Sequence, residues 1–388
     1  MDAAREAPYR DALLDWMACA IGGAPQPAAR AARAAGDGLL ERVTAAGTAG
    51  HVLDYDDTYL PGMAHLSAAT APVALVLGAG QGASAAGALA AYAAGFEAAG
   101  ALGRAAHPGL YDAGWHPTAV CGTLGAAVTA ARLLGLDEAQ TRSAAGLSLL
   151  RSGGFRSAFG SAGKSLQVGL AASAGAAAAQ LGAAGAEVDL GQIAAGPAGF
   201  EQVFGTGVEL TTEGDAVTEN WIKAYPCCLQ THGAIETALM ARDAEAVSGG
   251  KPAGSVEVTV HPVSLQAAAV VDPQDGLQAK FSIPYLTGFT LIHGAPGLDS
   301  FGEVDDDARR LGRRMTVRAD AALSESEARL AIDTNPVARV EAALGSPQRP
   351  MDDEQLAAKR GSLAGERLEG ALEDPERPAA ELLALLEP

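Results

Sequence analysis

Residues Ser165–Gly182 read SLQVGLAASAGAAAAQLG, a stretch of small and apolar residues that follows a loop rich in glycine. Alanine loses no side-chain entropy in a helix, so this composition predicts a helix that packs closely against its neighbours. Nearer the N-terminus, Trp16, Met17 and Ile21 recur at helical spacing. Helices are expected within residues 9–47 and over residues 68–80, 83–102, 120–134 and 137–151. Together these patterns predict a large all-helical domain.

The character of the sequence changes after about residue 220. Ser255–His261 (SVEVTVH) alternates between apolar and polar residues, which indicates a strand. Shorter strands are expected at 315–318 and 338–341, a helix at 279–293, and helix again at 352–386. The expected fold class is therefore mainly α. Residues 1–222 would form a helical domain completed by the tail 352–388, and residues 223–351 a smaller α+β domain.

The composition limits the partners of the protein. The 388 residues include 46 acids and 27 bases, a net charge of −19. Such a surface repels nucleic acid and anionic membranes, so we expect neither as a partner. A small anionic substrate would need a local cluster of cations, which makes the few Lys and His residues candidates for a site.

Four cysteines occur, Cys19, Cys121, Cys227 and Cys228, and none has the spacing of metal ligands. Reduced thiols in a cytosolic protein are the expectation. The N-terminus lacks the pattern of a signal peptide, and the long apolar stretches are built mostly of Ala and Gly rather than Leu or Ile. We therefore expect a cytoplasmic protein.

Two glycine motifs imitate nucleotide-binding sites. Residues 78–83 (GAGQGA) fit the G-x-G-x-x-A turn of dinucleotide-binding folds, with Glu97 further on. The stretch around Glu97 has no β-branched residue, so the second strand is missing and a helix–turn–helix is favoured. A nicotinamide dehydrogenase stays a minor alternative. Gly163-Lys164-Ser165 imitates the end of a P-loop, but Ala158 stands where the first glycine belongs, so that interpretation is rejected.

Five segments carry residue types suited to acid–base chemistry. They are HVLDYDDT at 51–58 with His65 after it, GWHPT at 114–118, GSAGK at 160–164, KAYPCCLQTH at 223–232 and FSIPY at 281–285. Each has an ordinary structural explanation, such as a helix cap, a loop or a solvated Lys. Lys164 begins a helix, where the helix dipole disfavours a cation, which hints at a function. The order and spacing of the five segments together are specific.

In this combination the chain resembles the 2-methylcitrate dehydratase (MmgE/PrpD) family, which includes cis-aconitate decarboxylase and iminodisuccinate epimerase. The resemblance runs from about His51 to Lys359. It implies a large all-helical domain, an α+β lid domain, a site in the cleft between them, a homodimer and no cofactor. The implied catalytic residues are Asp54, His116, Lys164, His232 and Tyr285, and the implied substrate-binding residues are Thr58, His65 and Lys223. No metal ligand set is expected.

Three positions depart from the family pattern: Leu66 stands where a proline is usual after the histidine, and two more positions differ on the Ala-rich helix. Gln167 and Leu170 stand where many members carry His and Arg. The exchange removes two possible contacts to a substrate carboxylate. A less charged substrate or a specialised biosynthetic role is therefore compatible with the sequence.

The resemblance also implies a reaction, the removal of a proton next to a carboxylate. This step builds an enediolate, so cations or donors must face the developing charge. Imidazole, with a pKa of about 6.5, suits the base. We expect His116 or His232 to be the base and the other the acid, with Lys164 holding a substrate carboxylate, Asp54 orienting a His or Lys, and Tyr285 donating a proton.

The same first step serves three outcomes: dehydration, decarboxylation and epimerisation. We expect a lyase, either dehydratase or decarboxylase, acting on a small polycarboxylate, with an epimerase or isomerase as the alternative. A non-catalytic paralogue that keeps the fold as a scaffold belongs to a different class. The retained ionisable residues argue against it, because a scaffold has no physical need for them.

Overall fold

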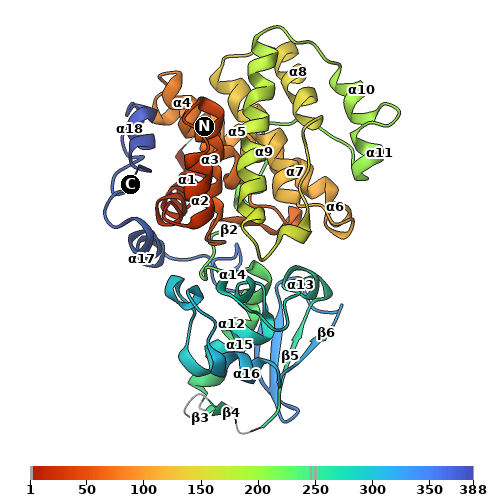
Figure 1. Ribbon diagram of the computed structural model, residues 1–388, viewed down its shortest axis with the longest axis vertical. Helices are drawn as coiled ribbons and strands as arrows, with labels where there is room; N and C mark the ends of the chain where they lie inside the picture. The colour runs from red at the N-terminus through yellow and green to blue at the C-terminus, as the bar shows by residue number, and fades with distance from the viewer. Residues whose placement is uncertain (1–2, 245–246, 249–250, 253, 388) are drawn as a thin grey trace. The chain divides into compact units, whose positions relative to one another are not determined.

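The computed structural model describes residues 3–244, 247–248, 251–252 and 254–387. The chain divides into two compact units (Figure 1). A helical unit comprises residues 1–158, 162–222 and 352–388, and a smaller unit comprises 159–161 and 223–351. The protein is mainly helical with one small mixed sheet, as the sequence predicts.

The helical unit consists of helices joined mostly by short loops. The helices are α1 (Ala3–Gly23), α2 (Pro27–Ala34), α3 (Leu39–His51), α4 (Ser67–Gly80), α5 (Ala85–Ala106), α6 (Gly109–Asp112), α7 (Pro117–Leu133), α8 (Glu138–Leu149), α9 (Gly163–Ala183), α10 (Leu190–Ala195), α11 (Phe200–Phe204), α17 (Asp353–Ala364) and α18 (Ala379–Ala384). Single turns of 3-10 helix occur at η1 (Leu60–Gly62), η2 (Arg156–Ala158) and η3 (Ala216–Glu219). The short strands β1 (Thr58–Tyr59) and β2 (Asn220–Trp221) pair in antiparallel fashion.

Helix α7 forms the centre of this unit. Every residue from Pro117 to Ala131 is buried, and α4, α5, α8 and α9 pack around it. Small side chains on these helices let the backbones approach closely, as the Ala-rich sequence predicts. Helix α5 is long and apolar enough to cross a membrane by length and composition, but 78% of its most apolar window is buried among other helices. It therefore has the burial of a core helix.

The C-terminal tail belongs to the helical unit. Helix α17 packs on α1, and α18 packs on α4 (Figure 1). A buried ion pair joins Lys359 Nζ on α17 to Asp15 Oδ1 on α1 at 2.6 Å, and the same ammonium donates to the Tyr55 carbonyl at 2.9 Å. The tail thereby supports the loop after α3, which carries several acidic residues.

The smaller unit places helices on a four-stranded sheet. Its helices are η4 (Leu229–Thr231), α12 (His232–Asp243), α13 (Pro262–Ala267), α14 (Gly276–Ala279), α15 (Ile283–His293), η5 (Leu298–Phe301) and α16 (Asp306–Gly312). Its strands are β3 (Val247–Ser248), β4 (Lys251–Pro252), β5 (Val256–Val260), β6 (Thr316–Ala319), β7 (Ala328–Ile332) and β8 (Asn335–Val340). The strand order is β6-β5-β7-β8, with β5 and β6 parallel and the other neighbours antiparallel; β3 and β4 form a separate pair.

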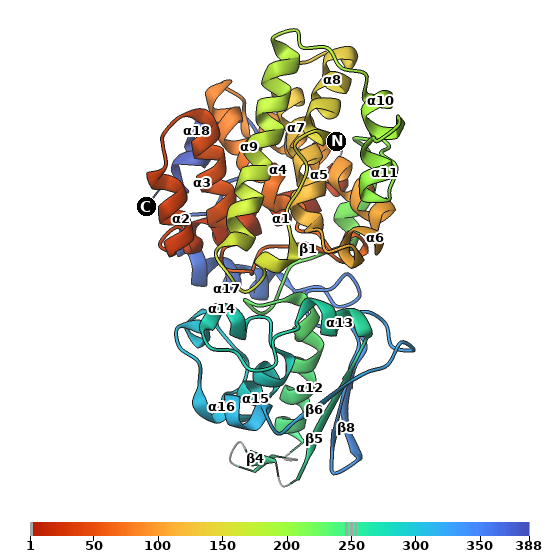
Figure 2. The ribbon, with the colours of Figure 1, turned by 45° about the vertical axis from the view of Figure 1, so that its right-hand side comes forward.

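One face of this sheet is covered by helices. Helix α12 packs on β7 and β8, and α15 and α16 follow on the same side (Figure 2). The residues of β5 alternate between buried and half-buried, which is the pattern of a strand with one face on a core. The core beneath the helices includes Tyr225, Cys227, Ile235 and Tyr285.

Local predictions fail where turns interrupt an apolar run. The helix predicted at 279–293 begins later, at Ile283, because the chain turns at Lys280–Ser282 and the Ser282 hydroxyl caps α15 by accepting from the Tyr285 N–H at 3.3 Å. The predicted helical tail is likewise interrupted after Gly365, whose φ is 61°. Helix α12 and strand β7 were not predicted. Around Gly82 the chain forms the expected turn between α4 and α5 rather than a dinucleotide-binding turn.

Candidate active site

Three helices and one loop of the helical unit bring seven polar side chains together. His51 is the last residue of α3, and Asp54, Asp56, Thr58 and His65 lie in the segment that leads from α3 to α4. His116 precedes α7, and Lys164 lies in the first turn of α9. All seven are buried. Burial of so many ionisable groups requires that they satisfy one another.

Lys164 links α9 to the end of α3. Its Nζ donates to Asp54 Oδ1 at 2.8 Å and to His51 Nε2 at 2.9 Å. The two helices come close because α9 carries Gly169, where a Cβ would lie 2.3 Å from the Thr44 carbonyl oxygen. A larger residue at 169 would separate the helices and pull Lys164 away from its partners. Asp54 itself has a φ of 54°, a left-handed conformation that a non-glycine residue adopts at some energetic cost.

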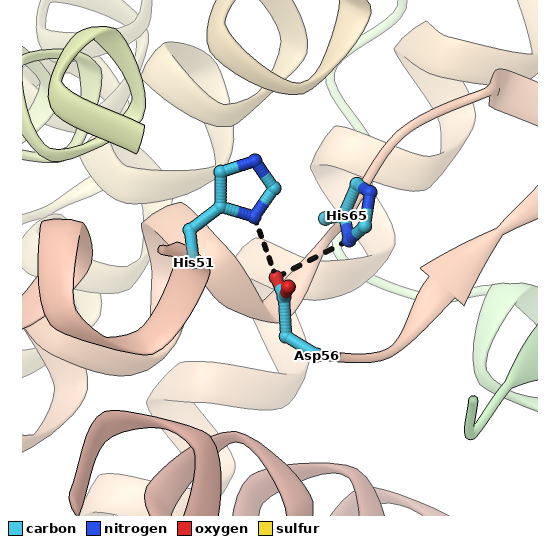
Figure 3. Close-up of side chains that lie close together, drawn as sticks. All are labelled: His51, Asp56 and His65. Carbon is cyan, nitrogen blue, oxygen red and sulfur yellow. Dashed lines mark hydrogen bonds and ion pairs between the residues drawn. The ribbon is translucent and has the colours of Figure 1, made fainter. Parts of the chain in front are cut away.

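Asp56 lies between two histidines (Figure 3). Its Oδ2 is 2.8 Å from His51 Nδ1 and 3.2 Å from His65 Nδ1. Burial alone would raise the pKa of Asp56, but the two imidazoles outweigh burial and hold that pKa well below its usual range. An ionised carboxylate only accepts hydrogen bonds, so both Nδ1 atoms carry a hydrogen.

The hydrogen-bond partners of His51 define which of its ring nitrogens carries the hydrogen. Nδ1 donates to Asp56, and Nε2 accepts from the ammonium of Lys164. Burial lowers the pKa of His51, against the opposing effect of Asp56. His51 is therefore a neutral imidazole that connects a carboxylate to a cation.

His65 has the same Nδ1 partner but a different Nε2 environment. Thr58 Oγ1 lies 3.4 Å from Nδ1 and donates to the Asp56 carbonyl at 3.5 Å. The His65 backbone N–H donates to Thr118 Oγ1 at 3.1 Å, which ties the residue to the first turn of α7. Nε2 is 3.8 Å from Asp54 Oδ1, beyond hydrogen-bond length. With its hydrogen on Nδ1, a neutral His65 has its lone pair on Nε2.

His116 is held by a different kind of partner. The side-chain amide of Gln167, one turn after Lys164 on α9, lies 2.7 Å from His116 Nδ1 through its nitrogen. Burial lowers the pKa of His116 well below its ordinary value, and the charge of Lys164 lowers it further. The imidazole rings of His51 and His116 are stacked 6.0 Å apart. His116 is thus a neutral histidine beside a cation.

Asp57 is buried behind the cluster. Burial raises the pKa of Asp57 to about 8, and the charges of Asp56 and Asp15 act in the same direction. The Asn220 amide donates to its Oδ2 at 2.8 Å, which joins the loop to β2. At neutral pH this carboxyl is therefore largely protonated, while its neighbour Asp56 is ionised.

The cluster also has the composition of a metal site. One ligand atom from each of His51, Asp56 and His65 lies within 4.8 Å of the others. Two imidazoles and a carboxylate suit several divalent cations. The same atoms are, however, already joined by hydrogen bonds, and the ammonium of Lys164 lies 2.9 Å from His51 Nε2, which disfavours a second cation there.

The remaining predicted site residues belong to the smaller unit. His232 is the first residue of α12, and its ring lies 5.1 Å from that of Tyr225. Lys223 is buried and donates to the Cys227 carbonyl at 3.1 Å. The Tyr285 hydroxyl accepts from the Asp305 N–H at 3.1 Å, and burial raises the pKa of Tyr285. All three residues are fixed within the fold of this unit.

The five predicted site residues of the helical unit, Asp54, Thr58, His65, His116 and Lys164, lie in one cluster. Sequence reasoning did not assign a role to His51 or Asp56. They are five residues apart, but His51 ends a helix and Asp56 lies in the loop after it, so no periodicity links them. Gln167 is known from the sequence only as a departure from the family pattern, and in the structure it contacts His116 directly.

The fold and the cluster define a class of protein: a mainly helical chain of two domains with a buried lysine–histidine–carboxylate network. The MmgE/PrpD N-terminal domain matches residues 40–213, and the MmgE/PrpD C-terminal domain matches residues 225–384. The chain belongs to the MmgE/PrpD family. The family is generally enzymatic, of a dehydratase-like type. No curated protein matches the chain closely enough to count as a relative.

Proposed function

We propose that the protein is a cofactor-independent lyase that acts on a small polycarboxylate. As a dehydratase it removes a proton next to a carboxylate and expels a hydroxyl group from the adjacent carbon; as a decarboxylase it releases a carboxylate as carbon dioxide and protonates the carbanion that remains. The observation that carries the proposal is the position of Asp56, which joins two buried histidines beside the ammonium of Lys164. Two requirements of the reaction are answered by parts of this network, and the third, a proton donor, is predicted in the smaller unit.

The first requirement is a base. The ionised Asp56 holds the hydrogen of His65 on Nδ1, so Nε2 offers its lone pair to a substrate proton. When His65 becomes an imidazolium, the same carboxylate stabilises the new charge. His65 therefore combines a basic ring nitrogen, Nε2, with a counter-ion at Nδ1. The sequence hypothesis assigned the base to His116 or His232, whereas these contacts favour His65.

The second requirement is stabilisation of the enediolate. Lys164 is buried and oriented by Asp54 and His51, so its charge is fixed before substrate arrives. A fixed cation in a site shielded from water acts strongly on developing negative charge and needs no rearrangement during the reaction. A substrate carboxylate is the group that Lys164 would hold.

The third requirement is a proton for the departing group. The roles predicted for His232 and Tyr285, as acid or proton donor, and for Lys223, as a substrate contact, stay predictions. All three residues are buried and lie in the smaller unit. Replacement of each in turn, as His232→Asn, Tyr285→Phe and Lys223→Met, measures its share of turnover.

The experiment is incubation with a panel of small di- and tricarboxylates in D2O, followed by NMR. We expect deuterium at the carbon next to a carboxylate, together with loss of water or of carbon dioxide from one member of the panel. Exchange without net conversion would support the epimerase alternative. Absence of both exchange and conversion across the panel contradicts the proposal.

A matched pair of histidine variants makes the experiment specific. His65→Asn removes the proposed base, so exchange should stop. His293→Asn makes the same change at the end of α15, where the side chain is 42% exposed and pairs with Asp305, and should leave exchange intact. Equal activity of the two variants would exclude His65 as the base.

A further inference from the structure

We propose that Gln167 fixes His116 as a neutral imidazole with its hydrogen on Nε2, so that His116 donates a hydrogen bond to the substrate oxygen that gains charge. The protonation state concerns the free protein and stands by itself, whereas the donor role rests on the proposed function. Gln167 acts through His116 and is a positioning residue.

The orientation of the Gln167 amide is set by the backbone of Phe155. The Phe155 N–H donates to Gln167 Oε1 at 2.9 Å, and the Phe155 carbonyl accepts from Gln167 Nε2 at 3.2 Å. A backbone N–H only donates and a backbone carbonyl only accepts. Reversal of the amide would place donor against donor and acceptor against acceptor. The nitrogen of Gln167 therefore faces His116.

This orientation determines the state of His116. An amide nitrogen donates and does not accept, and it lies 2.7 Å from Nδ1. Nδ1 must then hold the lone pair, which leaves the hydrogen of a neutral imidazole on Nε2. A second proton on Nδ1 would point at the Gln167 NH2 group and break the contact.

The backbone of His116 is attached to the same loop. Its N–H donates to the Gly154 carbonyl at 2.9 Å, next to the Phe155 backbone that orients Gln167. Gly154 has a φ of 118°, and a Cβ there would lie 2.8 Å from Ala119 Cβ and 3.2 Å from Gln167 Oε1. The main chain and the ring of His116 are thus located by one short segment, which restricts the position of Nε2.

The surrounding charges favour the neutral form. Burial and the charge of Lys164 act against a positive charge on His116, and Asp54 is the opposing charge. A neutral imidazole fixed in one tautomer can serve as a hydrogen-bond donor to a developing oxyanion. It does not need to lose or gain a proton to do so, in contrast to a general base.

The tautomer can be measured directly in the wild-type protein. Histidine labelled with ¹⁵N gives distinct signals for protonated and unprotonated ring nitrogens, and the His116→Gln spectrum assigns the signals of His116. We expect protonated Nε2 and unprotonated Nδ1 throughout the range from about pH 5 to pH 8, because the pKa lies well below its ordinary value. A protonated Nδ1 in the wild-type spectrum overturns the proposal without any variant.

Two variants test the part played by Gln167. In Gln167→Glu the carboxylate still accepts from the Phe155 N–H but no longer donates to Nδ1, so we expect Nδ1 to take up a proton. In Gln167→Met the polar contact is lost and both tautomers should appear. Gln180→Glu makes the same change at an exposed position of α9 and should leave the His116 signals unchanged. Circular dichroism establishes that each variant is folded; His116 signals that stay at their wild-type positions in folded Gln167→Met contradict the role of Gln167.

Turnover separates this inference from the proposed function. On a substrate found by the D2O panel, Gln167→Met should lower kcat about 10-fold or more while KM changes little, since the donor matters most in the transition state. A wild-type turnover of zero across the panel refutes the proposed function and the donor role but not the tautomer. An unchanged kcat in a Gln167→Met variant of mixed tautomers refutes the donor role alone.

Discussion

His65 and His116 are buried histidines of one cluster, yet their Nδ1 atoms meet opposite partners. His65 faces the carboxylate of Asp56, and His116 faces the amide nitrogen of Gln167. The Asp56 carboxylate accepts a hydrogen bond from His65, whereas the Gln167 amide donates one to His116. The lone pair is therefore on Nε2 in His65 and on Nδ1 in His116.

The difference shows how one residue type supplies two functions within a small volume. A carboxylate partner makes an imidazole a better base, because it stabilises the imidazolium that forms. An amide partner leaves the imidazole neutral and makes its Nε2 a donor. The identity of the residue next to each ring, rather than the histidine itself, assigns the role.

The largest expected effect comes from Asp56→Asn, which gives His65 an amide partner as His116 has. Loss of the carboxylate removes the counter-ion of the imidazolium, so kcat should fall about 10²–10⁴-fold. The measurement is deuterium exchange into the substrate, with ¹⁵N spectra of His65 as a second readout. A fall in kcat of less than a factor of about 3 would falsify the base assignment.

A smaller effect is expected for Lys164→Ala, which removes the positive charge of the cluster. The loss of a fixed cation should cost at least about 2 kcal/mol of transition-state stabilisation, or roughly 30-fold in kcat/KM. Arg142→Ala removes a cation from an exposed position of α8 and is the matched control. Equal kcat/KM for the two variants would show that Lys164 does not act on the reacting charge.

The sequence predicted the fold better than the contacts within the site. Small-residue helices such as α7 and α9 carry their periodicity and composition over many residues, so their positions were clear. Strand β7 was not predicted, because its sequence ARLAI is short and Arg329 interrupts its apolar residues. The start of α15 was predicted four residues too early, at 279 rather than Ile283, because a serine that caps a helix looks like any serine within an apolar segment.

Within the site, the sequence identified residues but not their partners. Asp54, Thr58, His65, His116 and Lys164 were predicted together from a resemblance, which carries no geometry. The pairing of Asp56 with two histidines depends on where α3 ends, and the pairing of Gln167 with His116 depends on the turn at Gly154. Such contacts join segments up to 51 residues apart and leave no local pattern.

A test of the His116 side alone is Gly154→Ala. An alanine at a φ of 118° is strained, and its Cβ would press on Ala119 and on the Gln167 amide, so we expect a loss of about 1–3 kcal/mol of unfolding free energy. The His116 signals should then report two tautomers while those of His65 stay unchanged. Gly153→Ala is the control, because no atom lies within 4 Å of a Cβ there. Equal unfolding free energies and unchanged His116 spectra in both variants would contradict the role given to the loop.

The smallest effect on turnover is expected at Asp57, beside Asp56 in the sequence but opposite to it in protonation. Because the pKa of Asp57 is raised from 3.8 to about 8 in the folded protein, the folded state binds a proton that the unfolded state releases above about pH 4. Its contribution to stability is therefore complete below pH 4 and is lost as the pH rises toward 8, by up to about 1.4 kcal/mol per pH unit.

Asp57→Asn resembles the protonated carboxyl in shape and cannot ionise, so between pH 5 and pH 7 its unfolding free energy should gain about 2–3 kcal/mol relative to wild type. Urea unfolding of both proteins at the two pH values measures this difference, and parallel pH dependences would mean that Asp57 is ionised. The comparison with Asp56→Asn then becomes decisive: two neighbouring aspartates receive the same substitution, and only the one that holds His65 should abolish turnover.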